Sequence, residues 1–231
     1  MVRLESLLST ISQEKYKEIL SGMSTLLLYP REGYKLAIEQ CWNALDEEHL
    51  RTSFWEFRNY AKEMELDDLQ AAYTELFDLN FHISLYAGYH LFGESYLRSM
   101  FLVGLSSRFA QIGFESNEEL HDHIGVLLRF LAEYPETQLA SELIEDAVLP
   151  MLNRIIWSKT RPEDKPGQIK PAMAYYALLR TLLLYLSGSE SGKEEVVNLP
   201  VQETAIEENI DRWIKGGNKS ETKQRRYHDG I

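Results

Sequence analysis

The sequence predicts an all-α protein that forms a single-domain helical bundle. Apolar residues recur at spacings of three and four along most of the first 187 residues, as they do on one face of an α-helix. No segment shows the sustained apolar–polar alternation of a β-strand, and no internal repeat is evident. Hydrophobic residues make up 44% of the chain, which is enough for a sizeable core. Residues 1–187 are therefore expected to form one all-helical domain.

Four helices are expected in the first third of the chain. They cover residues 14–30, 31–45, 47–64 and 66–80. Pro30 ends the first, because proline breaks the helical hydrogen-bond ladder. The apolar set expected to face the core in the second is Leu36, Ile38, Cys41, Trp42 and Leu45.

A short helix, a break at Gly93 and a long helix are expected over residues 82–113, with Gly113 as the C-cap. The apolar ladder of the long helix is Leu97, Phe101, Leu105 and Phe109. Ser116 and Glu119 then have the spacing of a capping box, which predicts that the next helix begins there. Its apolar stripe would be Leu120, His123, Ile124, Leu127, Leu128 and Leu131.

The C-terminal half ends in two helices and a tail. Residues 137–159 read as a helix that Pro150 kinks or breaks, and residues 169–188 as a strongly apolar core helix. After Gly188 the composition becomes polar and charged, so residues 188–231 are expected to be a mostly disordered tail with one short helix near 206–213. Truncation after Gly188 should then leave the melting temperature nearly unchanged.

Charge and cysteine content exclude several functional classes. The formal net charge of −12 repels phosphate backbones, which argues against nucleic-acid binding and favours basic partners. Cys41 is the one cysteine, so no disulfide can form within the chain, as is usual in a reducing cytoplasm. We find no export signal and no apolar run of the roughly 20 residues that span a bilayer. The expected location is the cytoplasm, without an integral membrane segment.

The stretch from Glu118 to His123 poses the main chemical question. On a helix, His121 and His123 would point about 200° apart and could not easily share a metal ion. Glu118 and His121 form one Glu-x-x-His, but no second copy exists for a di-metal site. No nucleophile-elbow or phosphate-loop motif is present, so the chain is not expected to be an enzyme. The alternatives left open are a helix start that Asp122 and His123 stabilise and a groove that binds a partner's peptide.

An ordered set of motifs resembles a known family. Its members here are Tyr73, Phe77 and Asp78; Ser84, Leu85 and Tyr86; His90, Gly93 and Glu94; Glu119, Leu120, Asp122 and His123; and Phe130 with Leu131. Over about residues 70–135 the chain resembles the NarJ branch of the NarJ/TorD redox-enzyme maturation chaperones. "LLLYP" at 26–30 is similar to the family's first helix.

The resemblance implies a cytoplasmic chaperone for a molybdenum oxidoreductase. Such a protein binds the N-terminal or signal segment of the apo catalytic subunit and assists insertion of the molybdenum cofactor and an iron–sulfur cluster. It carries no cofactor or metal of its own and handles the molybdenum cofactor only indirectly. Cofactor-biosynthesis proteins are further implied partners, and some members form homodimers. The residues expected to bind the client peptide are Asp122, His123, Tyr86, His90, Glu94, Tyr89, Glu119 and Phe77.

Two departures affect this site. His121 and Gly125 stand where the branch usually has prolines on either side of Asp-His-Leu, which restores two backbone N–H donors. The client is therefore either nitrate reductase or another molybdenum enzyme. The alternative function is a small helical metal-binding protein or enzyme that uses the cluster of histidines and acidic residues.

Overall fold

A computed structural model of the chain describes residues 13–79, 83–117, 119–157, 170–189 and 213. The described segments fold as helices with no β-strand, and their one β contact is an isolated bridge between Tyr86 and His123. The predicted all-α fold is therefore confirmed.

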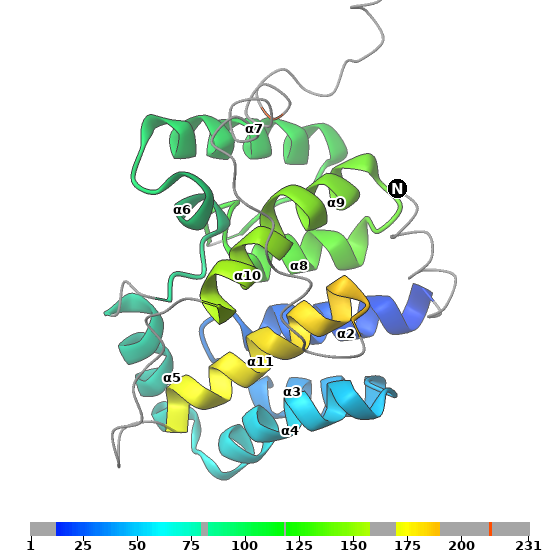
Figure 1. Ribbon diagram of the computed structural model, residues 1–231, viewed down its shortest axis with the longest axis vertical. Helices are drawn as coiled ribbons and strands as arrows, with labels where there is room; N and C mark the ends of the chain where they lie inside the picture. Colours follow the sequence, from blue (N-terminus) through cyan, green and yellow to red (C-terminus); the bar gives the residue numbers. More distant parts are fainter. Residues whose placement is uncertain (1–12, 80–82, 118, 158–169, 190–212, 214–231) are drawn as a thin grey trace, which may run out of the picture.

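The N-terminal third supplies one end of the bundle. Its helices are α2 (Gln13–Leu26), α3 (Tyr34–Ala44), α4 (Glu48–Glu63) and α5 (Leu66–Tyr73). α2 packs on α3 and α8, and α4 packs on α3 and α11. Figure 1 shows α3 and α4 together at one end of the molecule, with α7 at the opposite end.

The C-terminal part completes the core and the far end. Its elements are α6 (Ala87–Phe92), α7 (Tyr96–Ile112), α8 (Ile124–Glu133), α9 (Gln138–Leu143), α10 (Leu149–Ile156) and α11 (Lys170–Ser187). α11 lies against both α4 and α10, so the predicted core helix is central (Figure 1). Its Tyr175 hydroxyl lies 3.1 Å from that of Tyr34, which in turn donates to the Leu26 carbonyl at 2.7 Å.

Two short π-helical segments interrupt the α-helices. The first, η1 (Thr74–Asp78), continues α5, and the second, η2 (Ile144–Val148), joins α9 to α10. The second ends at Val148, two positions before Pro150, which has no N–H and stands in the first turn of α10. The predicted interruption at Pro150 is thus confirmed, as a π turn between two α-helices.

Glycines end two helices where the sequence predicted. Gly93 closes α6 at φ +61° and Gly113 closes α7 at φ +82°, conformations that favour glycine.

Two predictions about the core and the helix starts were wrong. Leu36 was expected to face the core but is 63% exposed, because α3 buries the face that carries Ala37, Ile38 and Cys41. The helix expected to begin at the Ser116–Glu119 capping box begins only at Ile124, so Leu120 lies in the preceding turn and is 48% exposed. Asp122 accordingly precedes the helix, and His123 is its N-cap.

The buried Trp213 belongs to the expected tail, residues 188–231. Trp213 is 2% exposed and lies among the core side chains, beside α7. Truncation after Gly188 would remove this contact, and its effect on the melting temperature stays a prediction. Apart from Trp213, the short helix predicted near 206–213 lies outside the described residues, as does Glu118.

Candidate functional site

The turn before α8 is tied to the start of α6 by backbone hydrogen bonds. Ala87 N–H donates to the Asp122 carbonyl and Ile124 N–H to the Leu85 carbonyl, both at 2.8 Å. These two bonds form the antiparallel bridge between Tyr86 and His123. The motif around Tyr86 and the motif around Asp122, 36 residues apart by number, are therefore held side by side.

Asp122 lies at the centre of this junction and is fully buried. Its Oδ2 accepts from the Gly88 N–H at 3.1 Å and from Arg98 Nε at 3.3 Å. Burial raises the pKa of the Asp122 carboxyl, while the Arg98 guanidinium and the Gly88 N–H oppose that rise. Asp122 thus joins three elements: the turn, α6 and the first turn of α7.

His123 caps α8 with its side chain. Its Nδ1 accepts from the Gly125 N–H at 3.1 Å, so the neutral ring carries its proton on Nε2. Burial lowers the pKa of His123 to about 4, which keeps the ring neutral at physiological pH. The N–H used here is one that a proline at 125 would lack, so the departure from the family pattern provides the cap.

Tyr86 connects the buried junction to the surface. Its ring meets that of His123 edge to face, with 5.0 Å between centroids, and its hydroxyl donates to Glu119 Oε2 at 3.1 Å. The Arg98 guanidinium lies 5.5 Å from the centre of the same ring. Burial, with Glu119 next in importance, raises the pKa of Tyr86 above its ordinary value, so the phenol keeps its proton.

The other predicted site residues lie around this group at different distances. His90 is joined to it through the Ser84 carbonyl, 2.6 Å from Nε2, and burial lowers the pKa of His90. Tyr89 packs edge to face on His90. Phe77 lies in a different cluster, with Tyr73 and Tyr175, and Glu94 is exposed in the turn between α6 and α7. The structure thus gathers Tyr86, Glu119, Asp122, His123 and His90, and separates Phe77 and Glu94 from them.

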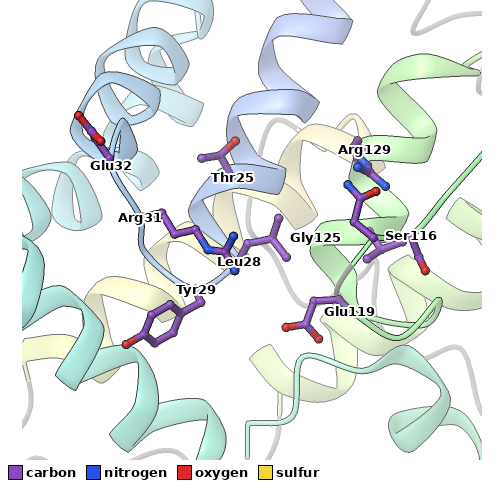
Figure 2. A pocket seen from close by; sticks show the side chains of 11 residues that line it. Thr25, Leu28, Tyr29, Arg31, Glu32, Ser116, Glu119, Gly125 and Arg129 are labelled. Carbon is purple, nitrogen blue, oxygen red and sulfur yellow. The ribbon is translucent and has the colours of Figure 1, made fainter.

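A pocket of about 380 Å³ opens between the end of α2 and the start of α8. Figure 2 shows Glu119 on one side of this pocket, Tyr29 and Arg31 on another, and Arg129 on α8. Its lining residues are Thr25, Leu28, Tyr29, Arg31, Glu32, Ser116, Asn117, Glu119, Gly125, Val126 and Arg129. Glu119 is the predicted site residue that lines it, and its bond to the Tyr86 hydroxyl links the pocket to the buried junction.

Close packing of α2 on α8 shapes the floor of this pocket. Ser24 Oγ donates to the Gly125 carbonyl at 2.7 Å. A Cβ at position 125 would lie 2.7 Å from Leu28 Cγ, so only glycine lets Leu28 approach this closely. The pocket therefore depends on the close approach of Leu28 to Gly125.

Sequence reasoning missed most of the lining. The side that α2 and the following loop supply comes from the "LLLYP" region, whose similarity to the family's first helix was the available signal. The charge was also not foreseen: Arg31 and Arg129 stand beside Glu32 and Glu119, so the lining is mixed rather than acidic. Arg129 is partly engaged, since it donates to the Glu115 carbonyl and lies over the Phe114 ring.

The histidines and acidic residues do not gather as metal ligands. His121 packs against the Phe109 ring, 5.7 Å between centroids, whereas His123 faces Tyr86. Within the ranges described, no three His, Cys, Asp or Glu side chains lie close enough together to hold a metal ion. The described helices also include none that is long and apolar enough to cross a membrane.

Comparison with known proteins finds a family model and curated relatives to which the chain is similar. Residues 43–154 match the family model described as the nitrate reductase delta subunit. The chain is also 30% identical, over 131 residues, to the nitrate reductase molybdenum cofactor assembly chaperone NarJ of Escherichia coli, in both strain K12 and O157:H7. These alignments cover 56% of this chain and 50% of each relative, so the chain spans about half the length of the curated relatives it matches. The matched region 43–154 contains the whole junction of Tyr86, Asp122 and His123. These matches confirm the resemblance to the NarJ branch of the NarJ/TorD family that the motifs between residues 70 and 135 first indicated.

Proposed function

We propose that this protein is an assembly chaperone, not an enzyme, for a molybdenum oxidoreductase of the nitrate reductase kind. It binds the N-terminal or signal segment of the apo catalytic subunit and keeps that subunit open while the molybdenum cofactor and an iron–sulfur cluster are inserted. A role before assembly or export implies action in the cytoplasm. Similarity to NarJ, which is named as a molybdenum cofactor assembly chaperone, supports the client class.

The observation that carries the proposal is the link between the pocket and the buried junction. Glu119 lines the pocket and accepts from Tyr86, and Tyr86 packs on His123. The pocket combines apolar walls from Leu28 and Val126 with the carboxylates of Glu32 and Glu119, and Arg31 and Arg129 also line it. The apolar walls and the two carboxylates suit a peptide that has an apolar side chain next to a basic one.

The predicted site residues have two different roles in this proposal. Glu119, and through it Tyr86, would meet the peptide, since Glu119 is partly exposed in the pocket. Asp122 and His123 are 0% and 2% exposed, and both already have hydrogen-bond partners inside the protein. They would hold Tyr86 and the start of α8 in place for the client.

Calorimetry tests the proposal directly. Full-length protein is titrated with a peptide of the first residues of the molybdenum oxidoreductase catalytic subunit from the same organism. A dissociation constant between micromolar and nanomolar, about −8 to −12 kcal/mol, is expected for a client that must later leave. Glu119→Gln and Tyr29→Ala should each weaken binding about tenfold or more, since each removes one pocket contact. Glu48→Gln, an exposed glutamate on α4, is the matched control and should bind as the wild type does.

A deletion strain tests the cellular side of the same proposal. Loss of the gene should leave the client reductase without its molybdenum cofactor, and Glu119→Gln should restore less activity than Glu48→Gln. Absence of peptide binding, together with a normally matured reductase in the deletion strain, would contradict the proposal.

A further inference from the structure

Trp213 packs closely against side chains of α7. Its ring meets Phe101 edge to face, 5.1 Å between centroids, and the Arg108 guanidinium lies 5.0 Å from its centre. The residue is 2% exposed although it lies 26 positions after Ser187, where α11 ends. An aromatic side chain held between a ring and a guanidinium is a specific contact and not a chance burial.

Gly104 makes room for the backbone of this residue. A Cβ at position 104 would lie 2.5 Å from the Trp213 carbonyl oxygen and 3.1 Å from its carbonyl carbon. The chain at Trp213 therefore touches the face of α7 that Phe101, Gly104 and Arg108 share. We define the Trp213 seat as Phe101, Gly104 and Arg108.

The same helix connects the Trp213 seat to the buried junction. Arg98, one turn before Phe101, pairs with Asp122. Phe101 itself lies against α6, with Cδ1 only 3.2 Å from where a Cβ of Gly88 would stand, and Gly88 donates to Asp122. At the other end of the seat, Arg108 pairs with Glu142 of α9 at 2.7 Å.

We propose that Trp213 is an intramolecular anchor: docking of this residue in the seat holds α7 in the position from which Arg98 reaches Asp122. Docked Trp213 thereby controls the order of the junction that supports Tyr86 and Glu119. Its consequence for client affinity rests on the proposed function, whereas its consequence for the junction does not.

The first test of the Trp213 seat is Gly104→Ala, whose effect on the melting temperature should be opposite in sign to the usual effect of this substitution. Alanine normally stabilises a helix interior relative to glycine by about 1 kcal/mol. In the full chain, Gly104→Ala should instead lower the melting temperature, because it expels the Trp213 backbone. In a Trp213→Ala background the same change should be neutral or raise the melting temperature. A stabilising Gly104→Ala in the wild-type chain would overturn the proposal.

Hydrogen exchange measured by mass spectrometry then tests the coupling to the junction. Trp213→Ala and Gly104→Ala should speed exchange several-fold in residues 83–92, where the amides of Ala87 and Gly88 donate to Asp122. Trp213→Phe keeps an aromatic ring and should lie between Trp213→Ala and the wild type. Leu50→Ala, a buried substitution on α4 at the far end of the bundle, controls for general loss of stability and should leave this segment's exchange close to the wild type. Unchanged exchange in 83–92 for both seat variants would refute the coupling.

Peptide titration separates this proposal from the proposed function. If the wild type binds the client peptide, the two seat variants should bind it about three- to tenfold more weakly, and Leu50→Ala should not. If the wild type binds no peptide, the proposed function fails, yet the melting and exchange results still decide whether Trp213 anchors α7. Equal peptide affinity in wild type and seat variants would contradict the effect on the client site.

Discussion

Asp122 and Arg98 form an ion pair in which one partner is fully buried and the other reaches solvent. Oδ2 lies 3.3 Å from Nε, the Asp122 side chain is 0% exposed, and that of Arg98 is 23% exposed. The asymmetry means that the two partners are not equivalent when the pair is broken. A buried carboxylate that loses its partner cannot be hydrated, whereas the partly exposed guanidinium can.

Arg98→Ala should therefore destabilise the protein more than Asp122→Asn. Removal of Arg98 leaves the Asp122 charge uncompensated, at a cost of about 3 kcal/mol. Asparagine at 122 still offers an oxygen to the Gly88 N–H and lets Arg98 turn to water, at a cost of about 1 kcal/mol. Urea unfolding at pH 7 measures both. The reverse order would show that Asp122 is not charged in the folded protein.

The stability of the fold should fall as the pH drops from about 6.5 towards 4 because of His123. Its pKa in the folded protein is about 4, below the ordinary histidine value of 6.5, so the unfolded chain takes up the proton first. The loss begins as the pH falls through the unfolded pKa and is complete below the folded one, where it amounts to about 3 kcal/mol. Asp122, whose pKa burial raises, favours the folded state at the acid end and offsets part of this loss.

His123→Asn isolates this contribution. Asparagine does not titrate and is a good N-cap, so it preserves the start of α8. Urea unfolding at pH 7, 6 and 5 should show a shallower decline for His123→Asn than for the wild type. Thr137→Asn, which changes the side-chain N-cap of α9 at a position that does not titrate, is the control and should keep the wild-type slope. Parallel slopes for His123→Asn and the wild type would mean that this imidazole is not the group responsible.

The sequence predicted the helices well where periodicity and glycine stops determined them, and poorly where tertiary contacts did. The ladder in α7 is buried at Phe101, Leu105 and Phe109, and Gly113 caps it. The start of α8 was misplaced because a local capping pattern at Ser116 competed with a cap from His123. That cap becomes visible only once the bridge to Tyr86 has fixed the turn.

The candidate site was foreseen in its motifs but not in its cavity. Tyr86, Glu119, Asp122 and His123 were all identified, because they belong to a recognisable ordered block. The α2 side of the pocket had only the similarity of the LLLYP region as a signal, and the burial of Trp213 against α7 had none, since both depend on long-range packing. A single tryptophan in a polar segment carries no periodic signal that would mark it as part of the core.

Gly125→Ala should destabilise the protein despite alanine's higher helix propensity. The new Cβ would lie 2.7 Å from Leu28 Cγ, and such overpacking costs about 1–3 kcal/mol. Thermal unfolding should show a fall of several degrees. Leu28→Ala in the same chain makes space for the methyl group, so the double variant should be more stable than the sum of the two single changes predicts. Simple additivity would show that Leu28 does not limit the approach of α2 to α8.

Tyr86→Phe should weaken binding of the client peptide while changing the stability of the fold only slightly. The change removes the hydroxyl that donates to Glu119 at 3.1 Å and leaves the ring against His123 and Arg98. Loss of one partly exposed hydrogen bond costs about 1 kcal/mol, so the melting temperature should fall by only a few degrees. Because Glu119 is then free to turn away from the pocket, client peptide affinity should fall about three- to tenfold in calorimetry. Tyr60→Phe, on α4 away from this pocket, is the matched control and should bind normally. Equal affinity for Tyr86→Phe and the wild type would mean that the carboxylate of Glu119 does not depend on Tyr86 for its position.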